Sequence, residues 1–548
     1  MAILARSQRD YSSPALFFGS IANAAAVEPS KVSREADPAS PRLTILFLVR
    51  SLKSLRYFQS ALELMIARGH TVRLLQEKAD HDEIEQAWLE EMLKHPNFDS
   101  ESVPPLERGR WERRAFALQA GMAYLHFQRP EYADLKRYAI KAENRAPREV
   151  VRRAAGLPLL RTPRGLRLLY GLLAALERAV PTPRLPDEYF DRVGPDVLVV
   201  GDVGIRRSLS PAFVRAARRK GIPAATWVAS WDNLTTRPQM SVVASKVFVW
   251  NEFQVEEAVE LHGVSRDRLV VTGAPNFDHW FAWRPRPAAE FLDRVGLDPG
   301  KPMVLWVGSA INQWEPPEPP LIERWLLALR ASSNDVLREA NVLLRPHPLR
   351  ARQWLKSGFD DFERVVVWPR GSMSMPVDSE QKADYYDSIH HSRAVVGINT
   401  SAMIEAAIIG RQVMSFIDPD YHDSQLGALH FSRLLELSRG ALRVAQSLDE
   451  HIADLGALLD AEDPDGSEAA RRFVVSFIRP HGLEREVTPI LVDTVEELAA
   501  TPTEPLSDPR WIVPVRAAIV AAVAIRAFPR RVGSLGLRAR AAGARLKG

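Results

Sequence analysis

Cysteine is absent from this chain of 548 residues. Disulfide bonds and thiolate metal sites are therefore excluded, and the chain is compatible with a reducing cytoplasm. Long apolar runs are absent too, since no stretch reaches the roughly 18 consecutive residues of a membrane-spanning helix. Residues 1–40 lack the apolar segment of a secretory signal, and we interpret them as a flexible N-terminal arm.

Two common nucleotide-binding motifs are also missing. No Gly-x-Gly-x-x-Gly follows the first predicted strand, which disfavours a dinucleotide redox cofactor. No Gly-x-x-x-x-Gly-Lys-Ser/Thr occurs, which disfavours a P-loop nucleotidase. We therefore expect no cofactor. A metal site is not predicted either, because Asp418-Pro-Asp420 is typical of a turn and His390-His391 has no partners at ligand spacing.

Acidic residues are scarce in two segments. Residues 107–184 contain 17 Lys and Arg against 7 Asp and Glu, and residues 510–548 contain 9 Lys and Arg and no acid. Such charge favours an anionic partner, although a solvated arginine-rich face also explains the first segment. Nucleic acid is the disfavoured partner, because no helix-turn-helix or zinc-finger spacing occurs.

The apolar run 512–528 is interrupted by Arg516 and Arg526 and leads into a basic end. This pattern indicates an amphipathic helix that lies on an anionic membrane surface. The alternative is a helix that packs on the protein itself.

What the chain does contain is a regular alternation of short apolar strands and helical patterns. With 46% hydrophobic and 26% charged residues, a chain of this length predicts two or three globular domains. The alternation indicates the α/β class, with two Rossmann-like doubly wound domains that face a cleft. The predicted strands are 43–49, 71–75, 196–201, 224–228, 246–250 and 268–272, then 303–307, 342–344, 365–368, 395–398 and 413–416.

The domain boundaries follow from the same alternation. Residues 41–280 form the predicted N-terminal Rossmann-like domain, which would hold the acceptor, with a helical insertion at about 80–185. Residues 285–495 form the second Rossmann-like domain, which would hold a nucleotide-activated donor. Residues 510–548 form the basic amphipathic tail.

Polar residues follow two predicted strands of the second domain directly. Arg345 and His347 end the first of these strands, and Asn399, Thr400 and Ser401 end the second and open a helix. Ligands of open α/β sheets bind outside the carboxyl ends of the strands, and a helix N-terminus suits a phosphate. The pair of strand ends therefore predicts a diphosphate-binding site.

These motifs resemble those of GT-B glycosyltransferases, most closely the bacterial surface-polysaccharide branch, which contains capsule-polysaccharide transferases and CDP-glycerol glycerophosphotransferases. The resemblance covers roughly residues 42–495. It rests on Arg345-Pro-His-Pro348, on Asn399-Thr-Ser401 with Glu405, on Val271-Thr-Gly-Ala-Pro-Asn276 and on Arg479-Pro-His-Gly482. The resemblance implies that His347, Thr400 and Ser401 bind the donor diphosphate and that Glu405 binds the ribose or sugar of the donor.

Further donor contacts are expected from two other loops. Ser309 and Asn312 follow the strand 303–307 and are candidates for the leaving phosphate. Gly273 and Asn276 belong to the third matching motif, and the alternative for them is an ordinary turn.

The N-terminal domain is expected to supply the general base and the acceptor site. An inverting transfer needs a group that takes a proton from the acceptor hydroxyl, and the candidates at strand ends are Asp232 and Asp202. Trp231 can stack on a sugar or desolvate the neighbouring acid. A cationic loop is expected to hold an anionic acceptor, and its residues are Arg50, Lys53 and Arg56. The alternative is that these side chains only lie at the start of a helix.

We therefore predict a metal-independent glycosyltransferase or glycerophosphotransferase. Its partners would be a nucleotide-sugar or CDP-glycerol donor, a surface-glycan or lipid-linked acceptor, and an anionic membrane bound through the tail. It would be cytoplasmic and peripherally associated with the inner face of the membrane. One alternative is an isomerase similar to UDP-N-acetylglucosamine 2-epimerase, and another is a non-catalytic scaffold or glycan-binding protein of the same fold.

Overall fold

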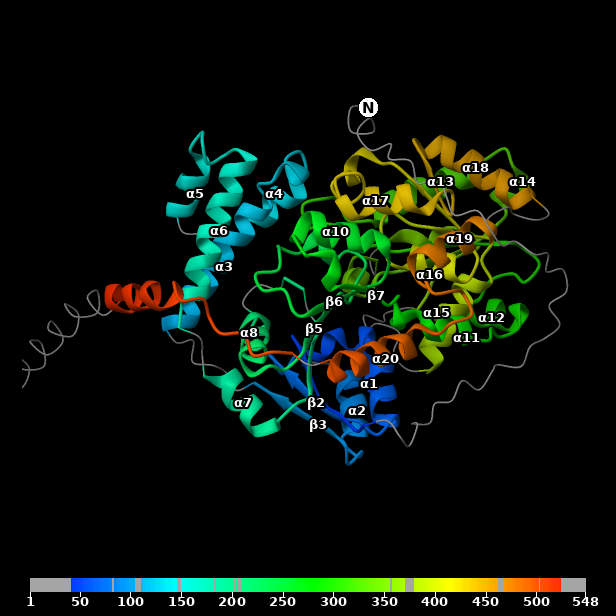
Figure 1. Cartoon of the computed structure of the whole chain (residues 1–548). Coiled ribbons are helices and arrows are strands. Elements are labelled where there is room, and N and C mark those ends of the chain that lie inside the picture. Colours follow the sequence, from blue (N-terminus) through cyan, green and yellow to red (C-terminus); the bar gives the residue numbers. More distant parts are fainter. Residues whose placement is uncertain are drawn as a thin grey trace, which may run out of the picture.

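The computed structural model describes residues 41–523, apart from residues 81–82, 104–109, 145–148, 182–183, 202, 205–207, 355–356, 370–378, 462–466 and 502. The predicted N-terminal arm, the tail from residue 524 onward and Asp202 lie outside the described residues. Two lobes, each built on a parallel sheet, make up the body of the molecule (Figure 1). This arrangement confirms the predicted fold class of two Rossmann-like domains.

The sheet of the first lobe is parallel throughout, in the order β3-β2-β1-β4-β5-β6-β7. Its strands are β1 (Thr44–Val49), β2 (Thr71–Gln76), β3 (Phe98–Ser102), β4 (Val197–Val200), β5 (Ala224–Trp227), β6 (Lys246–Val249) and β7 (Leu269–Val271). The central strand β4 is buried at every residue, as expected for a strand covered by helices on both faces. The strand order reverses between β1 and β4, which is where ligands of such sheets bind.

Helices cover both faces of this sheet. They are α1 (Gln59–Ala67), α2 (Glu83–Met92), α7 (Leu185–Val193), α8 (Ser210–Lys220), α9 (Asn233–Thr236) and α10 (Glu252–His262), together with α20 (Val487–Ala500) from the end of the second lobe. Leu491, Val492 and Val495 of α20 pack into the core of the first lobe. The chain therefore crosses between the lobes twice, once through α11 (Asp278–Ala282) and once on its way back to α20.

The second sheet is also parallel, in the order β10-β9-β8-β11-β12-β13. Its strands are β8 (Met303–Val307), β9 (Asn341–Arg345), β10 (Val365–Val367), β11 (Ala394–Val396), β12 (Gln412–Phe416) and β13 (Leu442–Ala445). Its helices are α12 (Ala288–Val295), α13 (Pro319–Arg330), α14 (Asp335–Arg338), α15 (Ser379–His390), α16 (Ala402–Ile408), α17 (Leu429–Ser438), α18 (Leu448–Asp460) and α19 (Ser467–Phe477).

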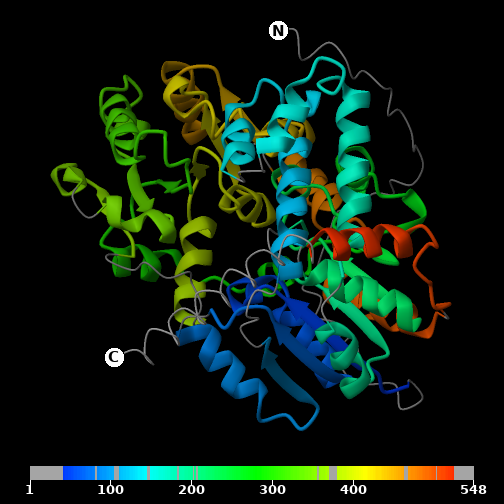
Figure 2. The same ribbon diagram turned by 90° about the vertical axis from the view of Figure 1, so that its left-hand side faces the viewer.

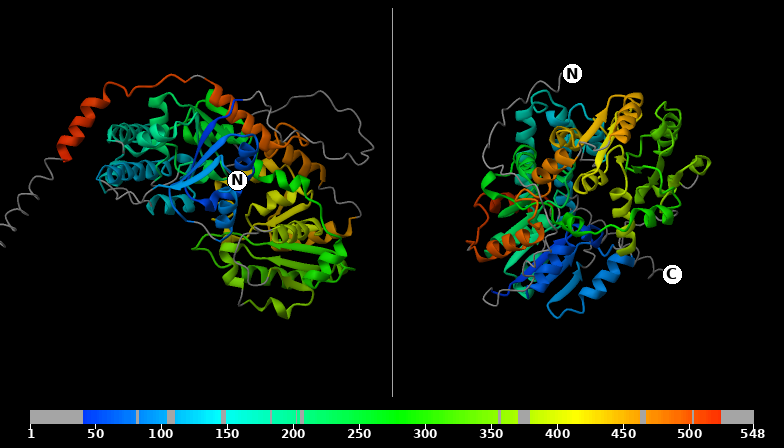
Figure 3. Two further views of the ribbon diagram at one scale, coloured as in Figure 1. Left: turned by 90° about the horizontal axis from the view of Figure 1, so that it is seen from below. Right: turned by 90° about the vertical axis from the view of Figure 1, so that its right-hand side faces the viewer.

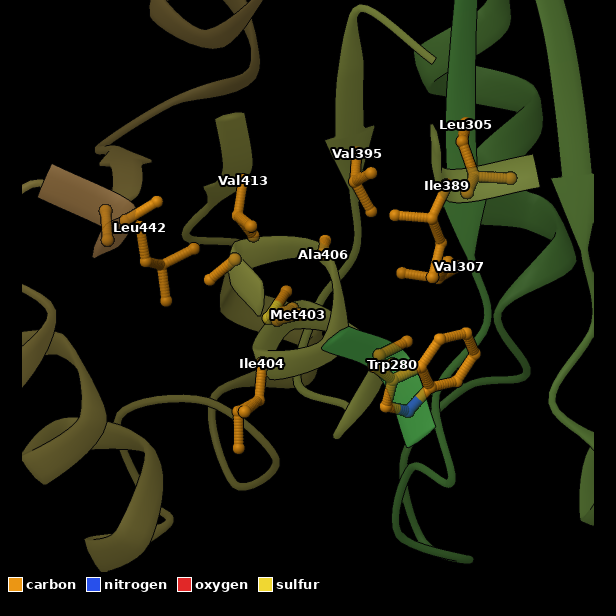
Figure 4. Close-up of a cluster of buried hydrophobic side chains, with 14 of the residues drawn as sticks. Trp280, Leu305, Val307, Ile389, Val395, Met403, Ile404, Ala406, Val413 and Leu442 are labelled. Carbon is orange, nitrogen blue, oxygen red and sulfur yellow. The ribbon is translucent and has the colours of Figure 1, made fainter. Parts of the chain in front are cut away.

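A continuous apolar cluster fixes the position of α16 on this sheet (Figure 4). Met403 and Ala406 of α16 pack against Val395 and Val413 of the strands beneath. The same cluster contains Trp231 of the first lobe, so the core extends from one lobe into the other. The lobes face one another across this contact (Figure 3).

The segment 80–185, predicted as a helical insertion, also contains two elements of the first sheet layer. Its first part holds α2 and the edge strand β3, both of which belong to the first sheet layer. The helices that project from the sheet are α3 (Arg110–His126), α4 (Lys136–Glu143), α5 (Glu149–Gly156) and α6 (Pro163–Ala179), and Figure 2 shows α3 and α6 standing above the sheet.

Beyond α20, the chain runs along the first lobe to a helix whose described part covers residues 512–523. Ile512 is fully buried there, and the Arg516 Nε donates to the Ala179 carbonyl at 3.3 Å, which places this helix at the end of α6. Within the described part of the chain, no helix combines the length and the apolar character needed to cross a bilayer.

Candidate active site between the lobes

Three adjacent strand ends of the second sheet form one wall of the candidate site. The order β9-β8-β11 places the ends that carry His347, Ser309 and Asn399 side by side. Gly308 makes this possible, because a Cβ atom at that position would lie 2.5 Å from the His347 backbone nitrogen. The Asn399 backbone N–H then donates to the Ser309 hydroxyl at 3.2 Å, which ties the third end to the second. The predicted convergence of the two strand-end motifs is therefore present.

The imidazole of His347 is neutral at physiological pH. Burial lowers its pKa to about 4, and the positive charges of Arg56 and Arg350 act in the same direction. Its Nδ1 atom accepts a hydrogen bond from the Leu349 backbone N–H at 3.2 Å, so the proton of the neutral ring lies on Nε2. A half-buried N–H donor is therefore held at the end of β9.

Ser401 connects the second lobe to the first. The Trp231 Nε1 donates to its hydroxyl at 3.2 Å, while Trp231 itself is only 8% exposed. Thr400 precedes it and is half-buried. The hydroxyls of Thr400 and Ser401 thus lie where Trp231 approaches the second lobe. Trp231 was predicted to be on the acceptor side.

Glu405, Tyr385 and Arg345 form a partly buried polar cluster next to these hydroxyls. The Tyr385 hydroxyl donates to the Glu405 carboxylate, and the Arg345 guanidinium lies over the Tyr385 ring at 4.8 Å from its centroid. Arg345 also donates to the Ser388 hydroxyl at 2.9 Å and is 8% exposed. The Arg345 guanidinium is therefore engaged by Ser388 and Tyr385 inside the second lobe, which leaves it in a supporting position behind Tyr385 and Glu405.

Burial shifts the pKa values of this cluster. It raises the pKa of Glu405, against the opposing effects of Tyr385, Arg56 and Arg345. It lowers the pKa of Arg345 to about 10, against the opposing charges of Tyr385, Asp384 and Glu405. The sequence did not indicate that Tyr385 belongs to this cluster, because a tyrosine within the helix α15 has no distinguishing pattern.

Arg56 brings positive charge from the first lobe to this wall. It lies in the last turn of a short 3-10 helix, η1 (Leu52–Tyr57), that follows β1, and it donates to the Tyr57 hydroxyl at 2.6 Å. Desolvation by the surrounding protein lowers its pKa, but Tyr57, Glu405 and Asp232 outweigh that effect, so the pKa is raised. Arg56 is therefore a permanent cation within electrostatic reach of both lobes, and its side chain is exposed.

Asp232 follows Trp231 in the loop between β5 and α9, and its charge acts on Arg56. Its carboxylate accepts hydrogen bonds from Ser230 at 2.8 Å and from Thr236 at 3.2 Å. Burial alone would raise its pKa, but His430, Ser230 and nearby cations lower it, so the carboxylate is ionised. The other candidate base, Asp202, lies outside the described residues.

His430 is a second residue that the sequence analysis missed. It lies in the first turn of α17, its ring packs edge-on against Trp231 with 4.9 Å between the ring centroids, and its Nε2 lies 3.2 Å from the Asn399 Nδ2. Burial lowers its pKa to about 3, so the ring is neutral, and its Nδ1 has no hydrogen-bond partner among the described residues. No motif surrounds it in the sequence, so only the fold brings it to Asp232.

Hydrogen bonds to buried and neighbouring side chains stabilise the loop after β8. Glu318 is almost fully buried and accepts from the Ser309 backbone N–H at 3.0 Å and from the Trp306 Nε1 at 3.1 Å. The Asn312 amide donates to Glu315 at 2.7 Å and to Ser424 at 2.9 Å. Ser309 and Asn312 therefore shape the loop through protein contacts.

The remaining predicted residues lie in other settings. Gly273 and Asn276 belong to the crossing between the lobes, where the Ala274 N–H donates to the Ile478 carbonyl at 3.0 Å. Arg50 pairs with the buried Glu77 at 2.5 Å, and Lys53 pairs with Asp80 at 2.5 Å. Of the predicted cationic loop, Arg56 is the residue whose charge acts on Glu405.

The described residues contain no group of three or more His, Asp or Glu side chains placed to hold a metal ion. The polar groups that do converge are two hydroxyls, an imidazole, two carboxylates and an arginine. Such a set can bind an anionic group on one side and accept a proton on the other.

Comparison with known proteins gives a loose likeness in fold. No protein-family model and no curated protein matches the sequence. A UDP-GlcNAc 2-epimerase from Neisseria meningitidis, bound to UDP-GlcNAc, shares 12% identity over 83% of this chain and 100% of its own, with a TM-score of 0.46. A glycosyltransferase from Rickettsia africae shares 10% over 84% and 99%, with a TM-score of 0.47. UGT89C1 from Arabidopsis thaliana shares 12% over 84% and 100%, with a TM-score of 0.45.

Proposed function

We propose that the chain is a GT-B glycosyltransferase or glycerophosphotransferase that moves a group from a nucleotide-activated donor to a surface-glycan or lipid-linked acceptor. The observation that carries the proposal is the neighbouring position of His347, Thr400 and Ser401 at strand ends of the second lobe. Trp231 of the first lobe contacts Ser401, and Arg56 of that lobe is within electrostatic reach of Glu405 and Asp232. Clefts between domains are preferred ligand sites. A donor diphosphate on the second lobe and an acceptor on the first would meet there.

On the donor side, the proposal assigns the diphosphate to the Nε2–H of His347, the hydroxyls of Thr400 and Ser401, and the guanidinium of Arg56. Charge develops on the diphosphate as the bond to the transferred group breaks, so fixed donors in a crevice stabilise the transition state. Arg345 would support this role indirectly, because its guanidinium holds Tyr385 and thereby Glu405. Glu405 would contact the ribose or sugar of the donor.

On the acceptor side, the acceptor hydroxyl would attack the electrophilic carbon or phosphorus of the donor. A bond forms from that oxygen, the bond to the nucleotide breaks, and the nucleotide leaves with the electron pair. The hydroxyl proton would pass to Asp232, which is ionised and therefore able to accept it. The neutral ring of His430, close enough for the Asp232 charge to act on it, is the second candidate for this proton.

A panel of nucleotide sugars and CDP-glycerol, incubated with the full chain and acceptor membranes, tests the proposal. Release of nucleoside diphosphate or monophosphate that requires the acceptor supports a transferase. Inversion at a sugar carbon without nucleotide release would instead identify an epimerase. If neither product forms and no nucleotide stabilises the protein, a scaffold or glycan-binding role replaces the enzymatic one.

The proposal places the protein in the cytoplasm, at the inner face of the membrane. The basic tail would bind anionic lipid there and bring the crevice to a lipid-linked acceptor. Fractionation of cells that produce the full chain, with and without a high-salt wash, checks this localisation, because attraction between charges weakens with ionic strength.

A further inference from the structure

The hairpin formed by α5 and α6 carries large apolar side chains that face solvent. Leu159, in the turn between the two helices, is 85% exposed, and Leu168 on α6 is 70% exposed. Val150, Leu157 and Leu172 are also more than half exposed. The hairpin therefore exposes five large apolar side chains within 23 residues, and a concentration of exposed apolar side chains marks an interaction site.

The packing of the hairpin does not account for these residues. Leu166, Leu169 and Leu173 form the inner stripe of α6 and already fill a core with Met122 and Leu125 of α3. Leu168 and Leu172 are four residues apart and form a second apolar stripe that faces away from that core. A helix that is apolar on both sides needs a second apolar environment.

Arginines surround this outer stripe. Arg161, Arg164 and Arg167 are exposed, and they lie in the turn and on the first turns of α6. Between residues 149 and 178 the acidic residues are Glu149 and Glu177. Glu149 pairs with Arg153, and Glu177 is buried and pairs with Arg215. Both acidic side chains are therefore neutralised by arginines, and the remaining exposed surface of the hairpin is apolar and cationic.

A second exposed apolar surface adjoins the far end of α6. In the helix at residues 512–523, Val513 is 67% exposed, and Trp511 just before it and Val520 are also exposed. The only charged residue of that range, Arg516, is directed to Asp508 and to the end of α6. Figure 2 shows this helix, in red, beside the base of α6.

We infer that the α5–α6 hairpin, together with the helix at residues 512–523, is a docking surface for an anionic lipid bilayer. Leucines in a turn flanked by arginines fit the boundary between acyl chains and anionic headgroups, where apolar burial and charge attraction add. The charge of the surface selects this occupant, because its exposed arginines outnumber its one exposed carboxylate, Glu149, which is paired with Arg153. The inference is independent of the reaction in the crevice and adds a folded docking element to the proposed role of the basic tail.

The absence of cysteine allows a direct test with the full chain. Leu159→Cys and Leu168→Cys are each labelled with a polarity-sensitive fluorophore and mixed with vesicles of equimolar phosphatidylglycerol and phosphatidylcholine. Leu327→Cys on α13, which is 56% exposed in the second lobe, is the matched control. We expect a blue shift and increased intensity at positions 159 and 168 and no change at 327.

A charge variant tests the headgroup contact separately. Arg161→Gln with Arg164→Gln is expected to weaken binding to these vesicles about fivefold for each arginine removed. The matched control is Arg443→Gln with Arg471→Gln, two exposed arginines of the second lobe, which should leave binding unchanged.

Three results would overturn the inference. One is the absence of vesicle binding by the unlabelled full chain. Another is binding with no spectral change at positions 159 and 168, which would assign the contact to the tail alone. The third is an equal loss of vesicle binding in the Arg161/Arg164 double variant and in the control double variant. Nucleotide-induced thermal stabilisation of each variant shows that the crevice is intact, so failure here is distinguishable from failure of the proposed transferase.

Discussion

At the scale of single residues, the sequence located the polar groups at strand ends but not their partners. His347, Thr400 and Ser401 follow apolar strands, and that pattern is visible in the chain. Tyr385 and His430 lie inside or at the start of ordinary helices, and only tertiary packing brings them to Glu405 and Asp232. Arg345 has the right position in the sequence, yet its guanidinium is engaged by Ser388 and Tyr385 inside the second lobe.

The two hydroxyls before α16 give the first prediction. Thr400→Ala with Ser401→Ala should weaken nucleoside diphosphate binding by about 1–3 kcal/mol, because each hydroxyl is proposed to donate to a charged oxygen. Isothermal titration calorimetry measures this loss. Ser265→Ala, an exposed serine of the first lobe, should bind like the unaltered chain. If the double variant and this control bound nucleoside diphosphate with equal affinity, the two hydroxyls would not be part of the binding site.

The candidate base gives the second prediction. Asp232→Asn should reduce the turnover number by a factor on the order of 100 or more and leave donor binding nearly unchanged, because a general base acts on the acceptor hydroxyl. His430→Gln should reduce it less if Asp232 takes the proton. Steady-state kinetics on both variants decide between the two residues, and the opposite ranking would transfer the role of base to His430.

At the scale of helices and strands, strongly patterned segments were predictable and weakly patterned ones were not. The strand β3 has the sequence Phe-Asp-Ser-Glu-Ser, which is polar because it lies at the edge of the sheet. The edge strand β13 has only four residues and an exposed arginine at its second position. Both were missed, since edge strands need not be apolar on both faces. The buried strands β1, β8 and β9 were all predicted.

The crossing between the lobes gives the third prediction. Gly273 has a φ of +93°, and a Cβ atom there would lie 2.7 Å from a Val487 side-chain carbon and 2.9 Å from the Ile478 carbonyl. Gly273→Ala should therefore lower the free energy of unfolding by about 2–4 kcal/mol, from backbone strain and overpacking together. Thermal or denaturant unfolding measures the change.

Gly296→Ala is the control for backbone strain alone. Its φ is +78°, but no atom lies within 4 Å of an added Cβ. We expect a loss of about 1 kcal/mol. Equal losses at both positions would show that the packing of α20 against the crossing contributes little to stability.

The end of α10 gives the fourth prediction, which concerns pH. The buried His262 donates through Nε2 to the Leu234 carbonyl at 2.7 Å and accepts the Met240 N–H on Nδ1 at 3.2 Å. Burial lowers its pKa from 6.5 to about 4. Because the unfolded chain binds this proton more readily, His262 causes stability to fall as the pH drops from 6.5 to about 4, by roughly 3 kcal/mol at most.

Unfolding free energies at several pH values test this sign. His262→Gln should be less stable at neutral pH but should lose less stability on acidification than the unaltered chain. His95→Gln, at an exposed histidine, should keep the full pH dependence. A His262→Gln variant with an unchanged slope would contradict the assignment.

At the scale of the whole molecule, the sequence predicted two facing parallel-sheet domains, and the structure confirms them. It did not predict how closely the lobes meet. Trp231 reaches Ser401 at 3.2 Å, and Arg433 of α17 pairs with Glu257 of α10 at 3.0 Å. Contacts between residues so distant in the sequence depend on the placement of whole domains, which local periodicity does not encode.

The central claim is that the strand ends of the second lobe bind the diphosphate of a nucleotide-activated donor in the crevice between the lobes. The most direct measurement is a crystal structure of the full chain with the nucleoside diphosphate that stabilises it most. We predict phosphate oxygens within hydrogen-bond distance of His347 and Ser401, with Arg56 facing them from the first lobe. A nucleotide bound outside the crevice, or a diphosphate that contacts neither His347 nor Ser401, would contradict the account.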